Sequence, residues 1–109
     1  MRHPAAAVAL SILLYASSAY CQSDSQANYA AKCQACHGVT GAGETPVGKM
    51  LKVKPFSDPQ ILIMTDASLT NVIAKGSGKM PGYQNQFSSD QIADLVVYLH
   101  QLQAKLQGN

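Results

Sequence analysis

The clearest hydrophobic pattern in the chain lies near its C-terminus. Apolar residues recur there three or four positions apart, at Ile92, Leu95, Val96, Leu99, Leu102 and Leu106. This spacing places them along one face of an α-helix. Ser88 with Gln91 supplies a capping box at its start, and Phe87 with Ile92 matches a hydrophobic staple. The pattern predicts a long amphipathic helix that opens at Ser88 and packs one face into a core.

Three further helices are predicted upstream. Residues 24–35 are rich in alanine and contain no glycine or proline, and Ser23 with Gln26 offers a capping box. Residues 58–64 begin with Asp-Pro, in which the aspartate caps and the proline takes the first helical position. Residues 65–76 begin with Thr-Asp and end at a glycine, which favours a helix end.

The segments between these helices are predicted to be loops. Residues 37–55 and 76–87 carry nearly all of the glycines and show no convincing alternation. The sequence therefore predicts an all-α fold of about four helices and two long loops. A compact domain this small rarely carries so much irregular chain unless a ligand organises it.

The start of the chain is predicted to be a secretory signal peptide. Arg2 gives a positive start, residues 5–16 are small or apolar apart from one serine, and Ser17-Ser18-Ala19 offers a cleavage site. The apolar run is short for a membrane span of about 20 residues. We expect residues 1–19 to be removed, leaving a single domain at 20–109. Cleavage after Cys21, or its acylation, is the alternative, although Tyr20 is a poor residue before an acylated cysteine.

Charge and size narrow the class of protein. Removal of the leader, which holds the only arginine, leaves seven lysines against six acidic residues. This balance is not the strongly basic footprint of a nucleic-acid-binding protein. A domain of about 90 residues often depends on disulfides, a metal or a cofactor. A disulfide between Cys33 and Cys36 would close only a tiny loop and stabilise little.

The segment "CQACH", residues 33–37, carries the most specific chemistry. A redox disulfide motif normally starts a helix after a strand, whereas this pair ends a predicted helix in a chain without predicted strands. A zinc site needs four ligands, and no second Cys/His pair follows. A structural disulfide leaves His37 unexplained. The remaining interpretation is c-type haem attachment, for which C-x-x-C-H is the signature.

The spacing suits that chemistry. Two thiols three residues apart project from one side of a helical turn and can reach two neighbouring vinyl groups of a porphyrin. His37 then lies beneath the iron and binds it through one ring nitrogen, while the other nitrogen needs an acceptor. An export signal agrees, because covalent attachment takes place outside the cytoplasm. We predict one haem c, covalently attached to Cys33 and Cys36.

Four segments together resemble the class I cytochrome c family, of the small bacterial monohaem type. They are "CQACH", "GETPVGK", "GSGKMPGY" and "SSDQIADLVVYLHQL", and the resemblance spans residues 24–102. It implies that His37 and Met80 are the axial ligands of the haem iron, and that the Pro46 carbonyl accepts a hydrogen bond from His37. It also implies that Tyr29 and Tyr98 lie where the first and last helices cross. Ser25 departs from the glycine often found at that crossing, which predicts a slightly wider approach.

The three methionines after the leader differ in the residues around them, which bears on which one is the iron ligand. Met64 is expected in a helix beside other apolar residues, where a methionine is usually a core filler. Met50 lies in a loop and is the second candidate. Met80 follows two glycines and precedes Pro81, which fixes the backbone and donates no hydrogen bond. This stiff loop favours Met80 as the ligand.

The remaining basic residues suggest a docking surface. Lys32, Lys49, Lys52, Lys54, Lys75 and Lys79 either ring the haem edge or form an ordinary solvated surface. His3 leaves with the leader, and His100 lies outside the leucine stripe, where we expect it to be exposed.

These features predict an electron carrier and not an enzyme. Two axial ligands leave no open iron position, and a methionine ligand raises the potential. We expect a soluble periplasmic carrier between a quinol-oxidising complex and a terminal oxidase or other reductase, without a small-molecule substrate. A peroxidase-like haem enzyme and a dedicated redox subunit of a dehydrogenase are the alternatives.

Overall fold

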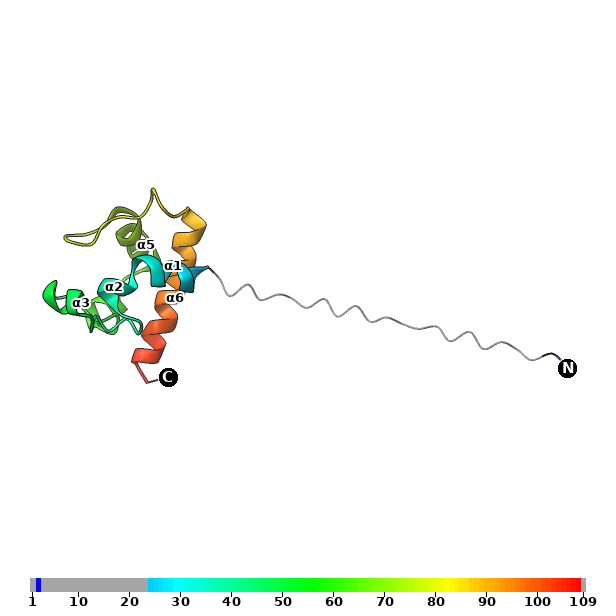
Figure 1. The fold of residues 1–109 in the computed structure, drawn as a ribbon, viewed down its shortest axis with the longest axis horizontal. Coiled ribbons are helices and arrows are strands. Elements are labelled where there is room, and N and C mark those ends of the chain that lie inside the picture. The colour runs from blue at the N-terminus through cyan, green and yellow to red at the C-terminus, as the bar shows by residue number, and fades with distance from the viewer. Residues whose placement is uncertain (1, 3–23, 109) are drawn as a thin grey trace.

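The computed structural model describes residue 2 and residues 24–108, and the domain is built from helices (Figure 1). In chain order these are α1 (Ser25–Lys32), α2 (Gln34–His37), α3 (Pro46–Met50), α4 (Pro59–Leu62), α5 (Asp66–Lys75) and α6 (Ser89–Leu106). Over the described residues, an isolated bridge between Ser77 and Met80 is the one pairing of extended backbone. The all-α prediction is confirmed, while the predicted leader and Cys21 lie outside the described residues.

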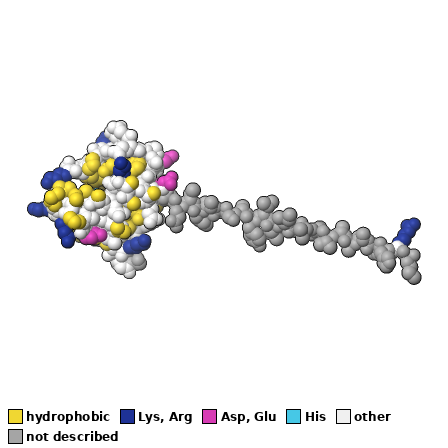
Figure 2. Space-filling model, in the orientation of Figure 1, with side chains coloured by type: hydrophobic (Ala, Val, Ile, Leu, Met, Phe, Trp, Pro, Cys, Tyr) yellow, Lys and Arg dark blue, Asp and Glu magenta, His cyan; other side chains and the backbone are white. Residues whose placement is uncertain are grey.

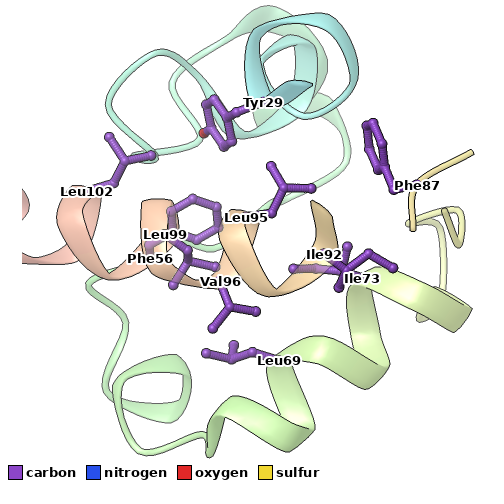
Figure 3. Packing of buried hydrophobic residues seen from close by; sticks show 10 residues of the cluster. All are labelled: Tyr29, Phe56, Leu69, Ile73, Phe87, Ile92, Leu95, Val96, Leu99 and Leu102. Atoms are coloured by element: carbon purple, nitrogen blue, oxygen red, sulfur yellow. The ribbon is translucent and has the colours of Figure 1, made fainter. Parts of the chain in front are cut away.

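Helix α6 organises the core. It packs against α1 and α5, and Figure 3 shows its apolar side chains between the helix that carries Tyr29 and the helix that carries Leu69. The buried apolar residues are Tyr29, Phe56, Leu69, Ile73, Phe87, Ile92, Leu95, Val96, Leu99 and Leu102. The predicted stripe is confirmed, with Leu106 partly buried at its end.

The start of α6 also follows the sequence prediction. The Ser88 hydroxyl accepts the Gln91 N–H at 3.2 Å, and the Gln91 side-chain oxygen accepts the Ser88 N–H at 2.8 Å. These two bonds form the predicted capping box and satisfy two backbone donors that a helix start would otherwise leave unpaired. Phe87 and Ile92 on either side of the cap are both buried in the core.

The first predicted helix is interrupted. Instead of one helix over 24–35, the chain leaves α1 at Cys33, whose φ of −111° lies off the helical value, and continues as α2 to His37. The Tyr29 hydroxyl donates a 2.6 Å hydrogen bond to the Gly38 carbonyl, which draws the end of α2 back toward α1. Such a tertiary bond is invisible to helix propensity. The N-cap is Asp24, without a side-chain capping bond, and Ser23 lies outside the described residues.

The first predicted loop contains a helix, which corrects the expectation for residues 37–55. Thr45 caps α3 by accepting the Gly48 N–H at 2.9 Å, and Pro46 takes the first helical position. Thr45 also donates a 2.7 Å bond to the Ala35 carbonyl, so α3 is tied to α2. A Cβ atom at Gly48 would collide with the Cys36 carbonyl, so this contact requires glycine. With α2 and α3, the described residues form six helical segments where about four were expected.

The second predicted loop, 76–87, is confirmed as irregular chain. Helix α4 ends at Leu62, so Met64 lies just beyond it and not within a helix. In the part of the chain that the structure describes, no helix has the length and apolarity needed to cross a membrane.

Candidate functional site

Two adjoining cavities lie between the helices and the loops. One has a volume of about 310 Å³ and the other about 360 Å³, and both are lined by Cys33, His37 and Met80. The first reaches into the apolar core, where its walls include Phe56, Ile61, Met64, Leu69, Val72, Ile73, Leu95 and Leu99. Pockets that bind organic ligands typically have this size and apolar character.

Both cysteines contribute free thiols to this site. Cys33 connects α1 to α2 and lines both cavities, while Cys36, on α2, lines the outer one. The His37 N–H and the Cys36 N–H both bond to the Cys33 carbonyl, which closes the turn that sets the spacing of the thiols. Burial, with a smaller contribution from the Cys36 thiol, raises the pKa of Cys33 to about 11. Cys33 is therefore a protonated thiol at neutral pH.

His37 is held as a neutral imidazole. Its ring stacks on the Phe56 ring, with centroids 4.8 Å apart and planes 28° apart. Burial lowers the pKa of His37, and the neutral ring is the form that binds metals. Its Nδ1 atom is buried without a hydrogen-bond partner among the described residues. The bond expected from His37 to the Pro46 carbonyl is therefore not formed in this structure.

Met80 is presented by a tight turn and lines the same two cavities as His37. Ser77 and Met80 exchange two backbone hydrogen bonds of 3.0 and 2.9 Å. Gly76 enters the turn with φ of 80°, and a Cβ atom there would lie 2.5 Å from the Met80 carbonyl. Gly82 leaves it so close to the end of α5 that a side chain would meet the Ala74 and Lys75 carbonyls. The turn therefore fixes Met80 at the cavity wall.

The other two methionines occupy different environments. Met50, at the end of α3, is 71% exposed and lines neither cavity. Met64 is partly buried against the core and lines only the deeper cavity. Of these three methionines, only Met80 lines both cavities, as His37 does. This position is the one expected of a second iron ligand.

The lysines divide into two groups. Lys32, Lys54 and Lys79 line the outer cavity, and Lys54 also donates to the Gln60 side chain at 2.5 Å. Lys49, Lys52 and Lys75 are exposed but line neither cavity. Figure 2 shows lysines bordering exposed hydrophobic side chains on one face of the domain. The structure thus places three of the six lysines at the mouth of the site.

The residues present fit a covalently attached haem. Two thiols, a neutral imidazole and a thioether surround an apolar space. Among the described residues, no acidic side chain lines either cavity. The unpartnered Nδ1 of His37 is the kind of buried polar atom that marks a functional residue.

Comparison with known families identifies the domain. Residues 22–99 match the family described as cytochrome c oxidase, cbb3-type, subunit III. The chain belongs to this family. It is a small c-type cytochrome, its cofactor is covalently attached haem c, and redox proteins are its partners.

A solved structure supports the fold of the cytochrome. It is described as the KustC0563 c-type cytochrome, and the two chains are 23% identical with a TM-score of 0.67. The alignment covers 73% of this chain and 98% of that one. No curated protein gives a significant match.

Phe56 is the site residue that the sequence did not reveal. It lies in an irregular segment, yet it is buried, stacks on His37 and lies edge-on to Tyr29 at 6.4 Å. Its only signal in the sequence is an aromatic residue placed directly after a proline. In contrast, the ring centroids of Tyr29 and Tyr98 lie 5.1 Å apart, which confirms the aromatic pair expected at the crossing of the first and last helices.

Proposed function

We propose that this cytochrome carries single electrons in the bacterial periplasm, between a quinol-oxidising complex and a terminal oxidase or another reductase. The observation that supports this most strongly is that His37 and Met80 line the same cavities from separate elements. If both residues held the iron of a bound haem, no position would remain open for a substrate. The predicted export signal supports the location.

Each side chain has a defined role in this proposal. The Cys33 and Cys36 thiols would form the two thioethers, and His37 and Met80 would hold the iron. When bound, haem c supplies a reversible one-electron couple, whose potential a methionine ligand raises. Once one nitrogen of His37 holds iron, Nδ1 requires an acceptor. The family resemblance assigns that acceptor to the Pro46 carbonyl on α3, which packs against α2.

A second candidate is a redox subunit bound permanently in a larger complex. It is favoured by the family description, which refers to an oxidase subunit. The two proposals differ in stoichiometry. A carrier should purify from periplasmic extract as a monomer or in variable ratio to other proteins. A subunit should purify in a fixed ratio with one larger protein.

The lysines at the mouth of the site predict electrostatic docking. Lys79 lines the outer cavity and Lys105 lies at the far end of α6. Charge pairs at a protein surface steer encounter and are screened over roughly 10 Å at 0.1 M salt. We expect electron transfer to an acidic redox partner to slow as salt rises, and Lys79→Glu to slow it by roughly tenfold at low salt. Lys52→Glu should have a smaller effect in the same direction, because Lys52 lies outside the cavity.

The measurement is a stopped-flow electron-transfer rate across a salt series. Lys105→Glu is the matched control, since it makes the same charge reversal far from the site and should leave the rate at the parent value. A rate independent of salt, together with no effect of Lys79→Glu, would show that docking depends on apolar contact instead.

A further inference from the structure

Gln103 is a buried polar residue on the apolar face of α6. It is 6% exposed and lies four residues after Leu99 and three before Leu106, within the hydrophobic stripe. A buried amide is costly unless its hydrogen bonds are satisfied. Its nitrogen donates to the Phe56 carbonyl at 3.1 Å, and its oxygen lies 2.8 Å from His100 Nδ1. Gln103 therefore joins the helix surface to the residue that stacks on His37.

The connection continues to the surface through His100. Its Nε2 atom lies 2.7 Å from a carboxylate oxygen of Asp66, the first residue of α5. The His100 side chain is 45% exposed and that of Asp66 is 74% exposed. The exposed His100 ring can therefore exchange protons with solvent, and its contacts lead through Gln103 to Phe56.

The donors and acceptors in this chain fix its protonation state. The Phe56 carbonyl can only accept, so Gln103 must turn its NH₂ toward it and its oxygen toward His100. His100 must then donate from Nδ1. The Asp66 carboxylate also accepts only, so Nε2 must carry a proton as well. All three contacts are satisfied together when the His100 ring carries both protons.

Phe56 is held at its backbone on both sides. Its N–H donates to the Gly41 carbonyl at 2.8 Å, and its own carbonyl accepts from Gln103. These two bonds place its ring on the His37 imidazole. Loss of the Gln103 bond would leave one anchor and an unpaired buried carbonyl, so the ring would gain freedom to move against His37.

We propose that Gln103 is a positioning residue for His37, which it orients by anchoring Phe56, and that protonation of His100 controls this anchor. The proposal rests on the role of His37 as an iron ligand proposed above. When His100 loses a proton, the charge-assisted bond to Asp66 is the stronger of its two contacts. The remaining proton stays on Nε2, and the bare Nδ1 then faces the Gln103 oxygen, which drives that amide to turn away from Phe56.

The two side chains that contact His100 set the direction in which its pKa is shifted. The hydrogen bonds to Asp66 and Gln103 raise the pKa of His100 above its ordinary value. Asp66, from α5, is the one charged group in the described residues that acts on the ring, and α1, which also packs on α6, brings none to it. The anchored state is therefore populated at low pH and is lost as pH rises through this raised pKa.

The test follows the His37 ring signals by NMR in the ferric, haem-loaded protein between about pH 5 and pH 9. In the parent they should shift with a midpoint equal to that of the His100 ring, measured in the same samples. Gln103→Met, which fills the same space without hydrogen bonds, should lose this response. His100→Gln cannot titrate, and its amide should turn the NH₂ toward the Asp66 carboxylate and the oxygen toward Gln103. Its His37 signals should therefore stay at the parent's high-pH positions at every pH.

Gln101→Met is the control, because Gln101 is exposed on the same helix and should keep the parent response. A parent whose His37 signals ignore pH, or a folded Gln103→Met that keeps the response, overturns the proposal. If Gln103→Met fails to fold, a pH response retained by His100→Gln overturns it, and loss of that response supports it. Failure of the ligand assignment is separable, since the parent would then show no iron-shifted signals from His37.

Discussion

Met80→Ala should lower the reduction potential by on the order of 0.2 V and should allow the reduced protein to bind carbon monoxide. Axial ligands set haem potentials over about 0.8 V, and the thioether is the ligand that favours reduced iron. Removing it leaves one iron position to water or to a neighbouring amine. Lys79 is adjacent and lines the same cavity, so its side chain is a candidate for that position.

The domain should stay folded in this variant, because the haem attachment proposed for Cys33, Cys36 and His37 is unchanged. The turn at Ser77–Met80 is closed by backbone bonds that do not involve the side chain, although loss of the iron contact should loosen residues 76–87. Potential and carbon monoxide binding should be measured beside Met50→Ala and Met64→Ala. If Met80→Ala keeps the parent potential and excludes carbon monoxide while either control loses both properties, Met80 is not the ligand.

Replacing both Cys33 and Cys36 by alanine should abolish covalent haem and leave a chain that does not fold stably. Without haem, the chain would have to leave the deeper cavity of about 310 Å³ unfilled. The apolar side chains that line this space would then face water, and each costs about 1.5–3 kcal/mol when it is exposed instead of buried. The sum over several such side chains is comparable to the whole stability of a small domain, about 5–15 kcal/mol.

Haem staining on a denaturing gel, with thermal unfolding, checks this expectation. Each single variant should keep one thioether and a folded but less stable domain. Cys21→Ala is the control, because Cys21 lacks the spacing to the histidine and should not affect attachment. A double variant with the parent's melting temperature and a full complement of covalent haem would contradict the assignment.

Local signals in the sequence predicted much of the fold. The stripe on α6, its capping box and the Asp-Pro start of α4 are short-range patterns, and each appears in the structure. The Thr45-Pro46 start of α3 carries the same kind of signal as Asp58-Pro59. Four glycines nearby favour a loop instead, although two of them, Gly43 and Gly48, allow close approach of the backbone.

Some residues of the site can likewise be predicted from short sequence motifs, whereas others depend on contacts between distant parts of the chain. The cysteines and His37 lie within five residues, and the glycine-rich turn around Met80 is equally local. Phe56 and Gln103 could not be found this way, because the hydrogen bond that joins them spans 47 positions. The sequence does contain one clue to Gln103, a polar residue at a core position of the α6 stripe. The break at Cys33 likewise depends on a contact between Tyr29 and Gly38 that propensity does not describe.

The most direct measurement is the mass of the purified native protein after extraction with acidic organic solvent. The expected result is a single species carrying one haem, with the added mass located on the peptide that contains Cys33 and Cys36 and no free thiol at either position. Haem released into the solvent, with a protein of polypeptide mass and two free thiols at these positions, would contradict the assignment of this domain as a carrier built around covalent haem.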